Sequence, residues 1–194
     1  MSRRNVVYAP LRMAEVMTAR LCHDFAGPLG TLAGMLELVG EGGAEDALPL
    51  AMQSVGTMSA RLRLVRAAWG RGDAPLARGE IADMTAGLPG AERYQFDFMA
   101  LQEPLEDPAG RILLCLLLIL PQALPRGGFV ALRQEAEGVS IDAPGAAWPD
   151  AIEMAEDSEV PATRDLAPVL ARLVAESAGW VFLRHGWTVL ARPQ

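Results

Sequence analysis

The chain has 194 residues, of which about half are apolar, and it carries a formal net charge of −7. This length suits one large domain or two small ones, and the apolar fraction is sufficient for a sizeable core. The acidic balance argues against a nucleic-acid-binding protein, which needs basic surface to meet phosphates. All 17 basic residues are arginine, which excludes the lysines of P-loops and of Schiff-base enzymes.

The two cysteines, Cys22 and Cys115, and the two histidines show none of the close spacings of a structural zinc site. The longest unbroken apolar run, residues 112–120, is about half the length that spans a bilayer. The first residues do not lead into a signal-like apolar segment. We therefore expect a cytoplasmic protein with no membrane partner.

Residues 10–41 carry apolar side chains at three-to-four-residue spacing, which predicts one long helix that ends at Gly40, Gly42 and Gly43. A second such stripe predicts a helix over residues 47–69, and the short link makes the two helices an antiparallel hairpin. A hairpin of two helices cannot cover its own apolar stripe. We therefore expect two chains to form a homodimer through a four-helix bundle.

The helical hydrophobic pattern ends near Arg71, in a stretch with glycine and proline. We therefore divide the chain into a helical hairpin domain (1–70) and a second domain (71–194). The hydrophobic pattern of the second domain predicts both helices and strands. In chain order these are strand 93–99, helix 109–124, strands 129–134 and 138–143, helix 165–178, and strands 180–184 and 187–191. The acidic residues 150–159 predict a mobile loop. This order indicates an α/β sandwich with helices on one face of a single sheet, and the whole chain belongs to the α+β class.

His23 lies on the first predicted helix, within the stretch LCHDFAGP. At ~100° per residue it points away from Leu21 and Phe25, so it faces water. Asp24 can accept a hydrogen bond from one ring nitrogen, which leaves the other nitrogen as a nucleophile. The pattern alone also fits an ordinary exposed histidine.

The surroundings of His23 favour a reactive site. Small residues lie beside it at helical spacing, namely Ala19, Ala26, Gly27 and Gly30. They leave room for the backbone of another protein, and Arg20 is placed to hold a phosphoryl oxygen. Pro28 removes the backbone hydrogen bond to the carbonyl of Asp24, so we expect the helix to bend or loosen there.

The pattern His23-Asp24-x-x-x-Pro28 resembles the H-box in the dimerisation and phosphotransfer domain of histidine kinases. More closely, residues 19–24 (ARLCHD) and 60–66 (ARLRLVR) resemble the ChpT-type histidine phosphotransferases. The similarity extends over nearly the whole chain and includes residues 123–128 (ALPRGG).

This resemblance implies a dimer built like a kinase core, with an ATPase-like domain that no longer binds nucleotide. Such proteins take a phosphoryl group from a receiver domain, typically on a hybrid histidine kinase, and pass it to the aspartate of a response regulator. His23 and Asp24 are then the catalytic residues. The docking surface comprises Arg20, Ala26, Gly27, Pro28 and Gly30. Arg61, Arg63 and Arg66 on the second helix either assist docking or are ordinary solvated side chains.

The second domain lacks the residues of a working kinase. By the resemblance, Cys115 and Ile119 take the two positions where kinases carry the Asn that holds Mg²⁺ on ATP, and neither offers an oxygen ligand. Residues 142–145 are a remnant of one Gly-rich phosphate loop, and residues 161–165 contain no glycine where the other belongs. The acidic segment 150–159 repels a triphosphate. We read Asp142 as a strand-end residue rather than an adenine ligand.

We therefore expect a phosphorelay intermediate that binds no cofactor of its own, with the Mg²⁺ and the catalytic lysine supplied by the receiver domain. Gly27 stands where kinases that dephosphorylate their partners carry a polar residue, so we expect weak phosphatase activity. Two alternatives stay open: an ATP-dependent histidine kinase, and a non-catalytic dimeric scaffold that has kept a kinase fold.

Overall fold

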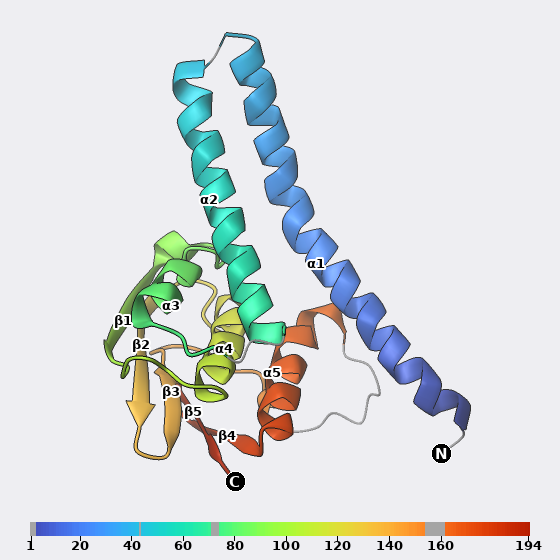
Figure 1. The fold of residues 1–194 in the computed structure, drawn as a ribbon, viewed down its shortest axis with the longest axis vertical. Helices are drawn as coiled ribbons and strands as arrows, with labels where there is room; N and C mark the ends of the chain where they lie inside the picture. The colour runs from blue at the N-terminus through green and yellow to red at the C-terminus, as the bar shows by residue number, and fades with distance from the viewer. Residues whose placement is uncertain (1–2, 43, 71–73, 154–161) are drawn as a thin grey trace.

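A computed structural model of the chain describes residues 3–42, 44–70, 74–153 and 162–194. A helical hairpin, formed by α1 (Arg3–Gly40) and α2 (Ala44–Trp69), stands out from an α/β domain that contains the rest of the chain (Figure 1). The predicted hairpin and the α+β class are confirmed. Within the described ranges, none of the helices combines the length and the hydropathy needed to span a membrane.

Helix α1 begins at Arg3, earlier than the sequence pattern predicts, and it remains a continuous helix across Gly27 and Pro28. The expected loosening therefore does not interrupt it. A proline removes one backbone hydrogen bond, and the backbone hydrogen bonds before and after it are sufficient to keep the helix continuous. The hydroxyl of Thr31 also donates to the carbonyl oxygen of Gly27 over 3.2 Å, which ties together the turn that contains Pro28.

The C-terminal part holds a five-stranded sheet in the order β1-β2-β3-β5-β4, in which β1 and β2 are parallel and the other neighbours are antiparallel. Its elements are α3 (Arg78–Thr85), β1 (Tyr94–Ala100), α4 (Ala109–Ala123), β2 (Gly128–Glu135), β3 (Gly138–Asp142), α5 (Leu166–Ser177), β4 (Trp180–His185) and β5 (Thr188–Pro193). Three short 3₁₀ turns are η1 (Ala91–Arg93), η2 (Asp150–Ile152) and η3 (Thr163–Asp165). The sequence pattern missed α3. In the expected acidic loop, residues 150–152 form η2, and residues 154–159 lie outside the described residues.

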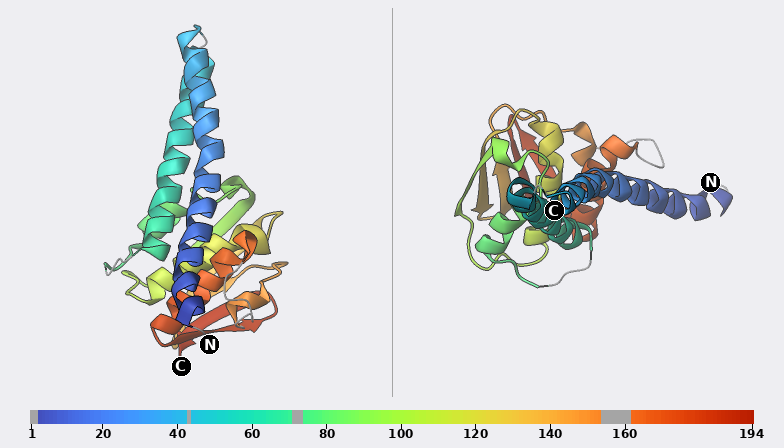
Figure 2. Two further views of the ribbon diagram at one scale, coloured as in Figure 1. Left: turned by 90° about the vertical axis from the view of Figure 1, so that its right-hand side faces the viewer. Right: turned by 90° about the horizontal axis from the view of Figure 1, so that it is seen from above.

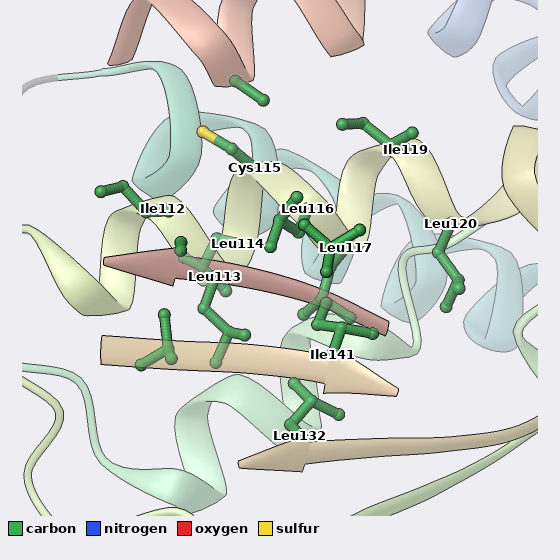
Figure 3. Packing of buried hydrophobic residues seen from close by; sticks show 14 of the residues in the cluster. Ile112, Leu113, Leu114, Cys115, Leu116, Leu117, Ile119, Leu120, Leu132 and Ile141 are labelled. Carbon is green, nitrogen blue, oxygen red and sulfur yellow. The ribbon is translucent and has the colours of Figure 1, made fainter. Parts of the chain in front are cut away.

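The core centres on α4, whose apolar run packs onto the inner face of the sheet (Figure 3). Leu113 and Leu117 are fully buried, as are Leu132 on β2 and Ile141 on β3. Each such side chain contributes about 2 kcal/mol through the apolar area it removes from water. The run 112–120 is therefore a buried helix, as its length predicts.

The C-terminal half of α2 belongs to this core. Leu64 and Ala68 are fully buried, and the carbonyl oxygen of Ala68 accepts hydrogen bonds from Arg111 Nε (3.1 Å) and Cys115 Sγ (3.4 Å) on α4. Helix α1 runs beside α2 and continues past the C-terminal domain, where it contacts η3 (Figure 2). The hairpin is thus held against the C-terminal domain on both of its helices.

Candidate functional site

His23 lies on α1 with 86% of its side chain exposed. The exposure predicted from the helix geometry is confirmed. A Cβ added to Gly27 or Gly30 would meet nothing within 4 Å, so the small residues next to the imidazole border open space. Ala26 and Pro28 are exposed on the same stretch. The surface around His23 is therefore accessible to the backbone of an approaching protein.

The side chain of Asp24 is nearly buried, with 12% of it exposed, and it contacts Arg20, His23 and Arg61. Its Oδ2 accepts hydrogen bonds from Arg61 Nη2 (2.5 Å) and Arg20 Nε (3.0 Å). Its Oδ1 lies 3.4 Å from His23 Nδ1, a weak hydrogen bond. The two arginines therefore fix the carboxylate, and the remaining oxygen faces one ring nitrogen of His23.

The pKa of Asp24 is lower than that of an ordinary aspartate. Burial by itself raises the pKa, but the charge of Arg61 and hydrogen bonds from Arg61 and Arg20 outweigh that effect. Asp24 is consequently ionised over the whole physiological range. An ionised carboxylate favours the His23 tautomer that carries its proton on Nδ1, which leaves Nε2 free to act as a nucleophile.

Arg61 is buried, with only 9% of the residue exposed, so it is not a solvated surface arginine. Besides the ion pair with Asp24, its Nη1 donates to the carbonyl oxygen of Gly87 over 3.2 Å. Gly87 follows α3 and packs directly on α2, because a Cβ at this position would lie 2.1 Å from the backbone nitrogen of Arg61. Arg61 thus connects the C-terminal domain to the carboxylate beside His23.

A cleft of about 570 Å³ opens between the hairpin and the C-terminal domain at this point. Its lining comprises His23, Asp24, Gly27 and Pro28 on α1, Gln53, Thr57 and Arg61 on α2, and the loop of residues 86–92. Sequence reasoning missed Gln53, Thr57 and the loop. The turn signal Gly87-Leu88-Pro89-Gly90 marks the loop in the sequence, but nothing there says that it faces His23.

The other predicted docking residues are distributed over two places. Arg20 lies beside the cleft and reaches the carbonyl oxygen of Thr163 in η3 with its Nη1 at 3.5 Å. Arg63 and Arg66 do not line the cleft, and both instead border a separate cavity near the end of α2. The structure therefore brings Arg20 and Arg61 to His23 and leaves Arg66 elsewhere.

A second, apolar groove of about 360 Å³ runs between α1 and α2. It is lined by Phe25, Leu29, Leu32, Val55, Met58, Ser59 and Leu62. Several large apolar side chains in and near it are half exposed or more, including Leu29 at 50%, Leu62 at 57% and Met52 at 68%. A surface of this kind is unusual on a monomer and is typical of a protein interface.

The two residues that the resemblance to histidine kinases places at the Asn positions lie inside the protein. Cys115 and Ile119 are fully buried, and burial raises the pKa of the Cys115 thiol to about 12. Asp142 is the last residue of β3, and its Oδ1 accepts a hydrogen bond from the hydroxyl of Thr188 at 3.0 Å. Trp148 is buried nearby, with its indole nitrogen donating to the carbonyl oxygen of Trp187. Cys115 and Ile119 are thus enclosed in the core, while Asp142 and Trp148 are each hydrogen-bonded within the protein.

Comparison with known proteins identifies the family of this fold. Residues 78–182 match the family model described as the histidine phosphotransferase C-terminal domain, which is more than half of the chain. The chain belongs to this histidine phosphotransferase family. The match lies within the C-terminal domain and does not include His23.

Two similar proteins align with regions of the chain that the family model does not cover. The protein phosphotransferase ChpT of Brucella abortus (strain 2308) is 33% identical over 134 residues, which is 67% of this chain and 64% of the relative. The chain therefore spans a little under two thirds of that relative's length. A solved structure of a bacterial phosphotransferase superposes with a TM-score of 0.69 at 27% identity, over 93% of this chain and 95% of the other.

Proposed function

We propose that this chain is a phosphorelay intermediate that takes a phosphoryl group from the aspartyl phosphate of one receiver domain and passes it to the aspartate of another. His23 carries the phosphoryl group between the two. The observation that supports this most strongly is the exposed imidazole of His23 beside the ion-paired carboxylate of Asp24. Membership of the histidine phosphotransferase family is independent support.

The transfer step uses the ring nitrogen that faces away from Asp24. Nε2 of His23 attacks phosphorus with its lone pair, and a P–N bond forms as the P–O bond to the receiver's aspartate breaks. That aspartate leaves as a free carboxylate, and the reverse reaction regenerates an aspartyl phosphate on the next receiver. Asp24 keeps the proton on Nδ1 and offsets the positive charge that the ring acquires.

Phosphoryl transfer also needs charge neutralisation on the transferring group. Receiver domains bring their own Mg²⁺ and lysine to this step, so the proposal assigns this chain no metal or cofactor. Arg20 is the nearest guanidinium on the helix of His23, with a third of its side chain exposed, and it is placed to contact a phosphoryl oxygen. The cleft beside His23 takes the receiver loops that surround the aspartyl phosphate.

The active unit in this proposal is a homodimer. The apolar groove between α1 and α2 is covered when the hairpins of two chains form a four-helix bundle. The observation in its favour is the half-exposed apolar surface of the hairpin, since burying a half-exposed Leu gains roughly 1 kcal/mol. The site lies on the outer surface of that bundle because His23 points away from the groove.

An ATP-dependent kinase is the alternative that the fold itself raises. The buried Cys115 and Ile119 argue against a kinase, because an apolar or thiol side chain inside the core cannot coordinate the Mg²⁺ that accompanies ATP. The hydrogen bond from Thr188 to Asp142 also argues against nucleotide binding, because it occupies a carboxylate oxygen that an adenine would need. Incubation of the protein with labelled ATP alone distinguishes the two, and robust self-labelling would favour the kinase.

A relay assay tests the proposal against a non-catalytic scaffold. A receiver domain carrying a labelled aspartyl phosphate is mixed with this protein and a second, unlabelled receiver. The wild-type chain is expected to move the label to the second receiver, and His23→Ala is expected to abolish the movement. The matched control is His185→Ala, because the chain holds only these two histidines. Continued relay by His23→Ala would reject His23 as the carrier.

A further inference from the structure

A cavity of about 270 Å³ lies between the end of α2, helix α3 and the start of α4, with every lining residue inside the described ranges. It shares no lining residue with the cleft at His23 or with the apolar groove of the hairpin. Arg61, which lines the cleft, and Arg63, which lines this cavity, are two residues apart on α2 and therefore face opposite sides of the helix. The cavity is thus independent of the proposed phosphotransfer surface.

Three arginines border the cavity: Arg63, Arg66 and Arg111. Among the residues that the structure describes, the ion pairs within 4.0 Å include none of the three. Arg111 is held in place because its Nε donates to the carbonyl oxygen of Ala68. The three residues therefore border one cavity with no carboxylate of the described residues within 4.0 Å of their guanidinium groups, and each guanidinium offers paired N–H donors that suit an oxyanion.

The acidic residues of the lining do not balance these charges. Glu80 and Asp107 set two negative charges against three positive ones. Glu80 is already engaged, because its Oε2 accepts a hydrogen bond from the backbone nitrogen of Ala77 at the start of α3. Helix α4 begins beside the cavity without an acidic residue in its first turn, which adds partial positive charge. The potential in the cavity therefore favours an anion.

The remaining wall is apolar and preformed. Leu105 and Met84 are buried, and Leu76 lies partly buried against the same core. Leu76 and Leu105 exchange two backbone hydrogen bonds, of 2.9 and 2.8 Å, which fix this wall. A cavity with an apolar wall on one side and convergent donors on the other is the usual form of a small-molecule site.

We propose that this cavity binds a small organic anion, with its carboxylate or phosphate group among Arg63, Arg66 and Arg111 and its apolar part against Leu76, Met84 and Leu105. The volume is slightly below the usual range of such sites, so the ligand is small, of about ten non-hydrogen atoms. Neither the oxyanion nor the apolar body alone uses both walls, so a ligand that combines the two binds most tightly.

Titration followed by amide NMR tests this, with the backbone amide of Gly110 in the cavity wall as the reporter. The probe is phenyl phosphate, compared with inorganic phosphate and with neutral benzyl alcohol. We expect a saturable shift at Gly110 with a Kd of about 1 mM or lower. The two partial probes are expected to bind at least about 5-fold more weakly. No saturable shift with phenyl phosphate up to roughly ten times that Kd would overturn the proposal.

A charge-matched pair of variants checks where the probe binds. Arg63 and Arg66 are exposed, so the double variant Arg63→Ala/Arg66→Ala is expected to fold and to lose at least about 10-fold in affinity. The control is Arg126→Ala/Arg133→Ala, which removes the same charge from exposed sites outside the cavity and is expected to bind as the wild type does. Equal affinity in both double variants would reject the site.

The same titration on His23→Ala separates this proposal from the phosphorelay. Because the cavity and the cleft share no residue, His23→Ala is expected to bind phenyl phosphate with unchanged affinity. A loss of binding in that variant would contradict the separation of the two sites, whatever the relay assay gives.

Discussion

The hairpin and the C-terminal domain use apolar side chains in opposite ways. In the C-terminal domain, α4 buries ten of its residues and holds the sheet together. In the hairpin, side chains as large as Leu29, Leu36 and Met52 are half exposed or more. The proposed reactive histidine lies on the loosely packed hairpin, where a partner can reach it. The densely packed domain holds the carboxylate beside it in position.

The two regions meet at a short chain of contacts. Gly87 of the C-terminal domain packs on the backbone of Arg61, and Arg61 holds Asp24, which faces His23. A contact from the C-terminal domain thus helps to fix the carboxylate beside His23 on the exposed hairpin.

The largest expected effect concerns the packing of the C-terminal domain. In a Cys22→Ser variant the only thiol is Cys115, which is fully buried with its pKa raised to about 12 by that burial. A thiolate-directed reagent is therefore expected to react at least about 10³-fold more slowly in the native protein than in denaturant. Stopped-flow labelling measures the ratio. Comparable rates would mean that α4 is accessible and the core is loose.

The next effect tests the contact between the two regions. Gly87→Ala places a Cβ 2.1 Å from the backbone of Arg61, and we expect it to lower the free energy of unfolding by about 3 kcal/mol. Gly27→Ala is the matched control in the hairpin, where the added Cβ meets nothing. It is expected to raise helix stability by up to about 1 kcal/mol. Urea denaturation gives both values, and equal effects would mean that Gly87 does not pack closely on α2.

The apolar surface of the hairpin is tested by Leu62→Asp, since this side chain lines the groove and is 57% exposed in one chain. A buried charge in the dimer interface is expected to weaken association by about 100-fold, through several kcal/mol of desolvation. Light scattering over a dilution series measures this. Arg63→Asp, on exposed surface outside the groove, is the control. A wild-type protein that is monomeric at all concentrations would contradict the four-helix bundle.

The smallest effect concerns the Asp24 ion pairs and depends on pH. Because the pKa of Asp24 is lowered in the folded chain, its contribution to stability is fully present above the unfolded pKa of about 3.9 and is lost as the pH falls through the folded value. Asp24→Asn is therefore expected to cost about 1–2 kcal/mol near neutral pH and progressively less below pH ~4. A cost that grows toward acid would contradict the sign of the shift.

Periodicity and glycine breaks in the sequence predict the hairpin, α4, α5 and all five strands, because each is long enough to show its own hydrophobic pattern. Helix α3 was missed because its eight residues include Gly79 and follow a glycine-rich break. The exposure of His23 follows from the helix geometry alone. By contrast, the burial of Arg61 depends on Gly87, 26 residues away in the chain, and no local pattern encodes that contact.

Arg66 illustrates the same limit. Its position on α2 near Arg61 suggests a shared surface, yet a rotation of about 140° along the helix takes it to a different cavity. A helical wheel gives the direction of each side chain but not the domain that meets it there. The site at His23 was therefore predictable for the residues of α1 and only in part for those of α2.

The atom that carries the phosphoryl group decides whether His23 is the relay residue. The protein is exposed to a receiver domain that carries an aspartyl phosphate, and the product is analysed by tandem mass spectrometry and by ³¹P–¹⁵N NMR on ring-labelled histidine. We expect a single phosphoryl group per chain, on His23 and bonded to Nε2, with Nδ1 still protonated toward Asp24. Phosphate on His185, on Nδ1 of His23, or on no histidine at all would contradict this expectation.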